Sequence, residues 1–224
     1  MPDVETSVVR VRLIYEKRGS ACFVPHVALG PLFARAAKRA RLELSRTEGF
    51  SPHARISFGP ELPASVVALG EPVDLWLSAR EETTEEGRRG FLEYVNEAFN
   101  AQLPEGFLVT KCFLPAAGAP TPAKEYKAAH YLVWSGSACA AELLSHMERH
   151  YGQAFLNGFV DQDLRVSAVL SNPAQNGIGG LVKSLIANCV VAGWHDMRIV
   201  RAGLGRWNGK QMEPMEEAAA RFMA

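Results

Sequence analysis

The chain has 224 residues, of which 48% are hydrophobic and 21% charged, and its 24 basic residues balance its 24 acidic ones. This composition excludes a disordered or collagen-like chain and leaves room for one large or two small folded domains. The neutral total excludes a global field that attracts nucleic acid, but the charge is unevenly distributed. Residues 1–60 carry ten Lys or Arg against five acids, whereas residues 61–100 carry three against nine.

The four cysteines lie far apart and form neither a C-x-x-C pair nor the C-x₃-C-x₂-C arrangement of an iron–sulfur cluster. We therefore expect buried thiols, no metal site and no cofactor. The first twelve residues contain an early acid and no apolar run, and no later apolar run approaches the roughly 20 residues that span a bilayer. The sequence predicts a cytoplasmic protein without a membrane partner.

The first half of the chain predicts the order strand, helix, strand, strand, helix, strand. Alternating apolar and polar residues mark the first strand, and apolar residues at helical spacing give the first helix one apolar and one basic face. Thr83 or Thr84 is expected to cap the second helix. This order is the ferredoxin-like pattern of an α+β fold. The strands are expected at residues 8–15, 54–58, 72–78 and 106–114, and the helices at residues 26–42 and 83–100.

Residues 115–124 contain three prolines and four alanines, a composition that stiffens a connector without supplying a core. We expect a ferredoxin-like domain at residues 1–114, a linker at 115–124 and a smaller α+β domain at 125–224. The second domain allows a degenerate ferredoxin-like copy of the first. Its strands are expected at residues 127–134, 164–170 and 197–207, and its helices at 138–151, 179–191 and 213–223.

The segment SRTEGFSPHARISFGPELP, residues 45–63, is a loop whose path is heavily specified. Its two glycines permit backbone conformations that other residues avoid, and its three prolines fix φ and remove backbone donors. Such stiffness is typical of a binding surface. It is equally compatible with a loop that only connects two strands.

The run FVPHVALGPLFARAAKRARLELSRTEGFSPHARISFGPELP, followed by Glu71 and Asp74, resembles the radical SAM-linked proteins, a bacterial domain of unknown function found beside or fused to radical SAM enzymes. Ala28 and Pro31 stand where that family carries an aspartate and an arginine. The resemblance implies a radical SAM partner that owns the iron–sulfur chemistry, and a role for this chain in positioning the substrate. The matching positions are His26, Leu29, Phe33, Arg35, Ala36, Arg39, Ala40, Ser45, Gly49, Phe50, Pro52, Phe58, Gly59, Leu62, Pro63, Glu71 and Asp74, with a weaker match at Arg201 and Gly209–Glu216.

A non-catalytic binding or adaptor module that presents RNA, or an RNA-associated protein, to the radical SAM partner is the leading hypothesis. The basic helix face and the stiff loop favour phosphate contacts, which depend on charge and donors rather than on base reading. A solvated helix face is the ordinary alternative. The expected binding residues are Arg35, Arg39, Ser45, Phe50, His53, Arg55, Glu71 and Asp74.

Two other functions stay open. A metal-independent RNA-processing enzyme needs a general acid or base near a phosphate, and His26 or His53 with Arg35 supplies weak candidates. A structural or oligomerisation domain instead predicts no groove that joins Arg35, Arg39, His53 and Glu71. The enzyme is the less favoured reading.

Two further motifs suggest ligand sites, but we prefer structural explanations without a ligand. His146 and His150 stand four residues apart on an expected helix, a spacing that suits a shared metal, but no third ligand is evident. The sequence NGIGG at residues 176–180 opens another expected helix and suits an anion, but it matches no complete nucleotide-binding fingerprint. A solvated helix face and an ordinary glycine-rich turn explain them.

Overall fold

The computed structural model describes residues 7–79 and 84–215, and within them the first half of the chain forms four strands and two helices. Thr84 caps the second helix as predicted, because its hydroxyl accepts a hydrogen bond of 3.0 Å from the Gly87 amide. The elements in chain order are β1 (Ser7–Lys17), α1 (His26–Arg39), β2 (Ile56–Phe58), β3 (Val67–Ala79), α2 (Glu85–Asn100) and β4 (Phe107–Phe113).

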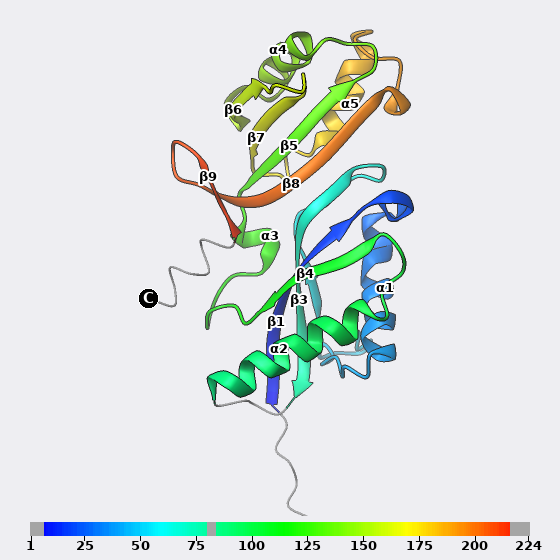
Figure 1. Ribbon diagram of the computed structural model, residues 1–224, viewed down its shortest axis with the longest axis vertical. Helices are drawn as coiled ribbons and strands as arrows, with labels where there is room; N and C mark the ends of the chain where they lie inside the picture. The colour runs from blue at the N-terminus through cyan, green and yellow to red at the C-terminus, as the bar shows by residue number, and fades with distance from the viewer. Residues whose placement is uncertain (1–6, 80–83, 216–224) are drawn as a thin grey trace, which may run out of the picture.

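The second half repeats this order of strand, helix, strand, strand, helix, strand after one short helix. Figure 1 shows the two halves stacked along the long axis of the molecule, with α1 and α2 beside the strands of the first and α4 and α5 beside those of the second. Its elements are α3 (Pro122–Glu125), β5 (Ala128–Ser135), α4 (Ala140–Tyr151), β6 (Phe155–Val160), β7 (Val166–Ser171), α5 (Ile178–Ala187), β8 (Met197–Trp207) and β9 (Met212–Pro214).

All nine strands of the described residues belong to one mixed sheet with the order β4-β1-β3-β8-β5-β7-β6, in which β2 also pairs with β3 and β9 with β8. The two halves meet where β3 runs parallel to β8, through Val67 and Ala68 opposite Val200 and Arg201. The predicted α+β class is therefore confirmed. The ferredoxin-like assignment and the domain boundaries stay predictions.

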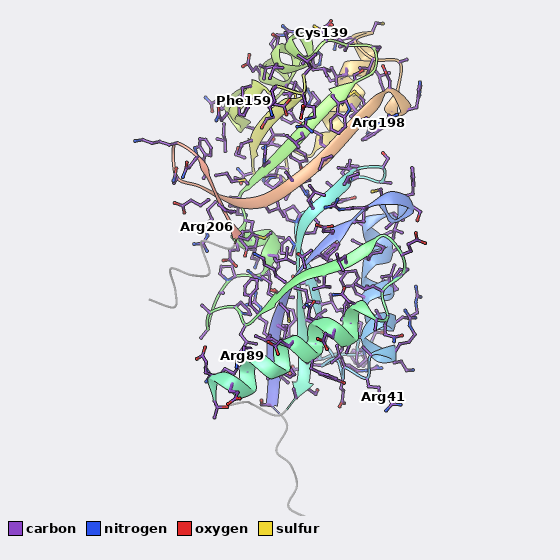
Figure 2. All side chains as sticks on the ribbon, viewed as in Figure 1. Arg41, Arg89, Cys139, Phe159, Arg198 and Arg206 are labelled. Carbon is purple, nitrogen blue, oxygen red and sulfur yellow. The ribbon has the colours of Figure 1, made fainter. Side chains whose placement is uncertain are left out.

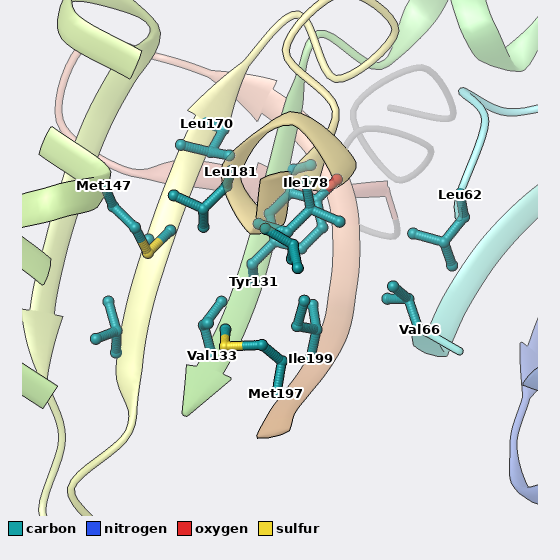
Figure 3. Packing of buried hydrophobic residues seen from close by; sticks show 14 of the residues in the cluster. Leu62, Val66, Tyr131, Val133, Met147, Leu170, Ile178, Leu181, Met197 and Ile199 are labelled. Carbon is teal, nitrogen blue, oxygen red and sulfur yellow. The ribbon is translucent and has the colours of Figure 1, made fainter. Parts of the chain in front are cut away.

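Two hydrophobic clusters follow from the alternation of side chains along the strands. In the first half, Val11 and Leu13 of β1 and Leu75 of β3 face Phe33 of α1 and Phe99 of α2, all at most 2% exposed. The second cluster lies between α4, α5 and strands β5, β7 and β8. In Figure 3, Leu62 and Val66 of the first half point towards this cluster.

Three elements differ from the sequence prediction. Strand β3 begins at Val67, before the predicted start at residue 72, because residues 67 and 68 pair with β8 and residues 68–72 pair with β1. Strand β6 was not predicted, since its Gly158 lowers strand propensity. Residues 212–214 form β9, so the prediction of a helix from residue 213 is wrong there; residues 216–223 of that helix lie outside the described residues.

Candidate functional site

Residues 44–55 form a hairpin loop along the outer edge of β3. Bridges pair Leu44 with Leu77 and Arg46 with Ala54. The Ser45 amide donates to the Trp76 carbonyl at 2.7 Å, and the Arg55 amide donates to the Ser45 carbonyl at 2.8 Å. Backbone bonds therefore fix the path of this loop, as its glycine and proline content suggests. We call residues 44–55 the hairpin loop.

The tip of the hairpin loop presents an aromatic side chain to solvent. Phe50 is fully exposed, with no side chain packed over it. Behind it, Thr47 and His53 close the turn, since the His53 ring nitrogen Nδ1 lies 3.1 Å from the Thr47 hydroxyl and the Thr47 amide donates to the His53 carbonyl at 2.9 Å. An exposed aromatic on a hydrogen-bonded turn is a low-entropy contact for a partner.

Next to the hairpin loop, Trp76 lies on the sheet face that points away from α1 and α2. Its ring contacts two guanidinium groups, that of Arg55 at 4.7 Å and that of Arg10 at 5.3 Å from the ring centroid. Arg55 is exposed, and Val8 on the same face is 53% exposed. Arg10, Arg55 and Trp76 form the Trp76 surface, in which Arg55 is exposed and Arg10 and Trp76 are partly buried.

Glu71, a predicted binding residue, is buried. It forms an ion pair with Arg201, which is 0% exposed and donates Nε to Glu71 at 2.7 Å. Arg201 also donates to the carbonyls of Pro60 and Glu61 at 2.8 and 3.2 Å. Burial acts to lower the pKa of Arg201, but the Glu71 charge outweighs it and raises that pKa. This clasp joins β3, β8 and the loop that follows β2.

Asp74, also predicted to bind, is fully buried between two arginines. Arg12 donates Nε to it at 2.6 Å, and Arg10 forms a second ion pair with it. Arg12 also forms an ion pair with Glu125 and donates to the Pro120 carbonyl at 2.9 Å. Arg10 donates to the carbonyls of Ala119 and Pro120. Residues 119 and 120 of the expected linker, and Glu125 just after it, are therefore fixed to the first half.

His26 stands at the start of α1, half-buried, with its ring against Phe58 at a centroid distance of 5.7 Å. Burial lowers its pKa, and the charges of Glu61 and Glu71 partly oppose that effect. Lys17 is 2% exposed nearby, its Nζ donating to the Val24 carbonyl at 3.0 Å, and burial lowers its pKa as well.

Arg35 and Arg39 lie on the exposed side of α1, as the helical spacing predicts. Arg39 donates to the Gln102 carbonyl at 2.7 Å, just beyond the end of α2. The structure thus keeps Arg35, Arg39, Phe50, His53 and Arg55 at the surface, whereas Glu71 and Asp74 lie inside.

A cavity that the sequence did not indicate opens along the edge strand β4. It has a volume of about 1020 Å³ and lies between α2, β4 and residues 114–120, with Arg12, Glu125 and Tyr126 at its base. Figure 2 shows Arg89 and Arg206, two of its lining residues, on α2 and near the junction of the halves. We call it the β4 groove. Because Arg10 contacts both Trp76 and the Ala119 carbonyl of the groove wall, the groove adjoins the Trp76 surface.

Within the described ranges, no three His, Cys, Asp or Glu side chains are grouped so that they could hold a metal ion. Across those same ranges, none of the helices is both long and apolar enough to cross a membrane.

A family model described as an uncharacterized protein conserved in bacteria (DUF2344) matches residues 10–166. The chain belongs to this family. The matched range contains the hairpin loop, the Trp76 surface and all of the predicted binding residues of this DUF2344 chain. The family description names no radical SAM enzyme, so that link stays a prediction.

A comparison with curated proteins finds no match to this DUF2344 chain. Among solved structures, a microcompartment protein from Desulfitobacterium hafniense DCB is similar to it, with 11% identity over 87% of this chain and 95% of that one and a TM-score of 0.22. That score is too low to support any inference about function.

Sequence reasoning missed Arg10, Trp76 and the β4 groove of this DUF2344 chain. The alternation of side-chain directions along residues 8–14 and 72–78 predicts that Arg10 and Trp76 point away from the apolar face of the sheet. It does not indicate that β1 and β3 pair with Arg10 opposite Trp76, which is what brings the two side chains together. The groove depends on the return of residues 114–120 across the sheet, for which the sequence carries no periodic signal.

Proposed function

We propose that this chain is a non-catalytic binding module that presents single-stranded RNA to a radical SAM partner. The observation that carries the proposal is Trp76, whose ring contacts the guanidinium groups of Arg10 and Arg55, together with the exposed Phe50 at the tip of the neighbouring hairpin loop. Sheet faces that carry aromatic side chains bind unpaired bases by stacking, and guanidinium planes stack bases as well as contacting phosphates.

Charge along the surface suits an extended polyanion. Arg46 and Arg55 of the hairpin loop are exposed. Phosphates that lie beside Trp76 would meet the basic groups of this loop. Local basic groups allow such binding although the net charge of the protein is zero.

The partner is inferred from the resemblance of the hairpin loop and α1 to the radical SAM-linked proteins. In this proposal the partner supplies the iron–sulfur cluster and the reaction, and this chain supplies the RNA-binding surface. The β4 groove, a mainly apolar cavity next to that surface, is where we place the contact with the partner, because concave apolar sites are common protein and ligand contacts.

Fluorescence anisotropy with labelled single-stranded RNA of roughly 12 nucleotides tests the RNA contact, since that length exceeds most single sites. We expect Arg55→Ala and Phe50→Ala each to weaken binding by about fivefold to 100-fold, as loss of one stacked base does. Arg198→Ala is the matched control, because Arg198 is an exposed arginine in the second half (Figure 2). Equal affinities for all four proteins would remove the RNA proposal.

Affinity purification of the tagged chain from its native cells tests the partner. We expect a radical SAM enzyme to co-purify, and Leu114→Glu in the groove wall to abolish the association while leaving RNA affinity unchanged. Leu108→Glu, at an exposed leucine on β4 that does not line the groove, is the control. Purification without any radical SAM enzyme would refute the adaptor role but not the RNA contact.

A further inference from the structure

A second cavity, with a volume of about 450 Å³, lies between α4 and α5 in the second half of the molecule. It is lined by His146, Arg149, His150, Ser184, Asn188 and Val190. Five of these six side chains carry hydrogen-bond donors, and three of the five can be cationic. None of the lining residues carries a carboxylate or a thiol.

The donors come from two helices that are held close together. Ser184 of α5 lies opposite His146 of α4, with 3.0 Å between the hydroxyl and Nε2, and His146 is 7% exposed. Gly180 of α5 lies opposite His150, since a Cβ there would be in ordinary contact, 3.6 Å, with the Nε2 of His150. Asn188 donates to the Ser184 carbonyl at 2.8 Å, which fixes the end of α5 at the cavity.

Like charges gather around His146. Burial lowers its pKa, and Arg149 and His150 lower it further, whereas the carboxylate that opposes them, Glu142, does not line the cavity. The Arg149 side chain has no hydrogen bond or ion pair with any other residue that the structure describes. The Arg149 guanidinium, which faces no carboxylate in this lining, is stabilised when an anion binds beside it.

A metal ion fits this cavity poorly. Two histidines four residues apart on one helix suit a metal, but Arg149 between them repels a cation, and within the described part of the chain no third ligand completes such a group. We propose that this cavity is a binding site for a phosphate group, held by Arg149, His150 and the Ser184 hydroxyl. The site goes beyond the RNA-binding surface and does not depend on it.

The helix dipoles weaken the binding of an anion at this site, but the side-chain donors strengthen it by more. Helices α4 and α5 end at Tyr151 and Ala187, so both negative ends lie near the cavity. Such an end weakens the binding of an anion by roughly twofold to fivefold at an exposed position. Charge-assisted hydrogen bonds from an arginine strengthen binding by about tenfold or more, so the side-chain donors outweigh the dipoles.

Isothermal titration of the full chain with inorganic phosphate, with chloride as the background anion, tests the proposal. We expect saturable binding that Arg149→Gln weakens by about tenfold and that Arg149→Gln with His150→Gln abolishes. Lys183→Gln is the control, because it removes one positive charge from α5 next to Ser184 without altering the lining. An unchanged midpoint of urea unfolding shows that each variant is folded.

A second arm distinguishes the sources of the phosphate. A 5′-phosphorylated oligonucleotide that binds more tightly than its 5′-hydroxyl form, with the difference lost in the double variant, identifies the end of a nucleic acid. Equal binding of the two forms, together with binding of free phosphate, identifies a small phosphate compound. No saturation by phosphate up to about 10 mM, or equal affinity in the double variant, would overturn the proposal.

Discussion

The clasp between Glu71 and Arg201 predicts a large and specific loss of stability. Glu71→Gln keeps the shape of the side chain but leaves the Arg201 charge unpaired at 0% exposure. Removing one partner of a buried ion pair costs about 3–5 kcal/mol, out of a total of roughly 5–15 kcal/mol for a folded protein. Urea unfolding at pH 7, followed by circular dichroism, should show a midpoint lower by about 1–2 M.

A double-mutant cycle separates the pair from its surroundings. Arg201→Met also frees the carbonyls of Pro60 and Glu61, so it is destabilising by itself. If the clasp is as described, the double variant Glu71→Gln with Arg201→Met loses at least about 2 kcal/mol less than the sum of the losses of Glu71→Gln and Arg201→Met. Additive losses of unfolding free energy, or a loss below about 1 kcal/mol for Glu71→Gln, would refute the buried ion pair. Glu71 would then again be a candidate for binding at the surface.

Three further predictions follow from other buried groups. Asp74→Asn should lower the free energy of unfolding by about 3–5 kcal/mol in the same urea assay, because it leaves two arginines short of a charge. At pH 8 a thiol reagent should label exposed Cys139 rapidly and Cys112 slowly, as read by peptide mass spectrometry, because burial raises the pKa of Cys112 to about 12. Burial lowers the pKa of His130 below 6.5, so the unfolded chain binds the proton first. The contribution of neutral His130 to the free energy of unfolding is therefore complete above pH 6.5 and is lost as the pH falls below that value. In His130→Gln, the free energy of unfolding should fall less steeply below pH 6.5. An unchanged pH dependence would contradict this.

The elements with strong periodicity or caps were predicted from the sequence, and those that depend on tertiary contacts were not. Strand β8 spans residues 197–207 as expected, and α2 begins after Thr84 as its cap predicts. Strand β6 was not predicted, because a glycine such as Gly158 in the middle of a segment indicates that a strand is interrupted there. In the structure a Cβ at that position would lie 2.3 Å from the Phe155 ring, so glycine is there to accommodate packing.

The residues of the candidate site also fall into those whose position could be predicted from the sequence and those whose position could not. Exposure of Arg35, Phe50 and Arg55 could be predicted, because helical spacing and the turn residues around Gly49 place them outside. The burial of Glu71 and Asp74 could not, because it depends on arginines far away in the chain. Arg201 lies 130 residues from Glu71, and single-sequence periodicity does not report such pairing.

The matched family motif therefore contains two kinds of residue. Glu71 and Asp74 form buried ion pairs, Glu71 with Arg201 of the second half and Asp74 with Arg12 of the first. Phe50 and Arg55 belong to the surface that we propose for RNA. Substitutions of the first kind should lower stability, and substitutions of the second kind should lower affinity at unchanged stability.

Photocrosslinking to single-stranded RNA that contains 4-thiouridine tests the central claim most directly. Mass spectrometry of the crosslinked peptides reports which side chains touch the bases. We predict crosslinks in the hairpin loop, at Phe50, and at Trp76 on β3. Crosslinks confined to the second half, or no crosslink above the level of an RNA-free control, would contradict the claim that the Trp76 surface binds RNA.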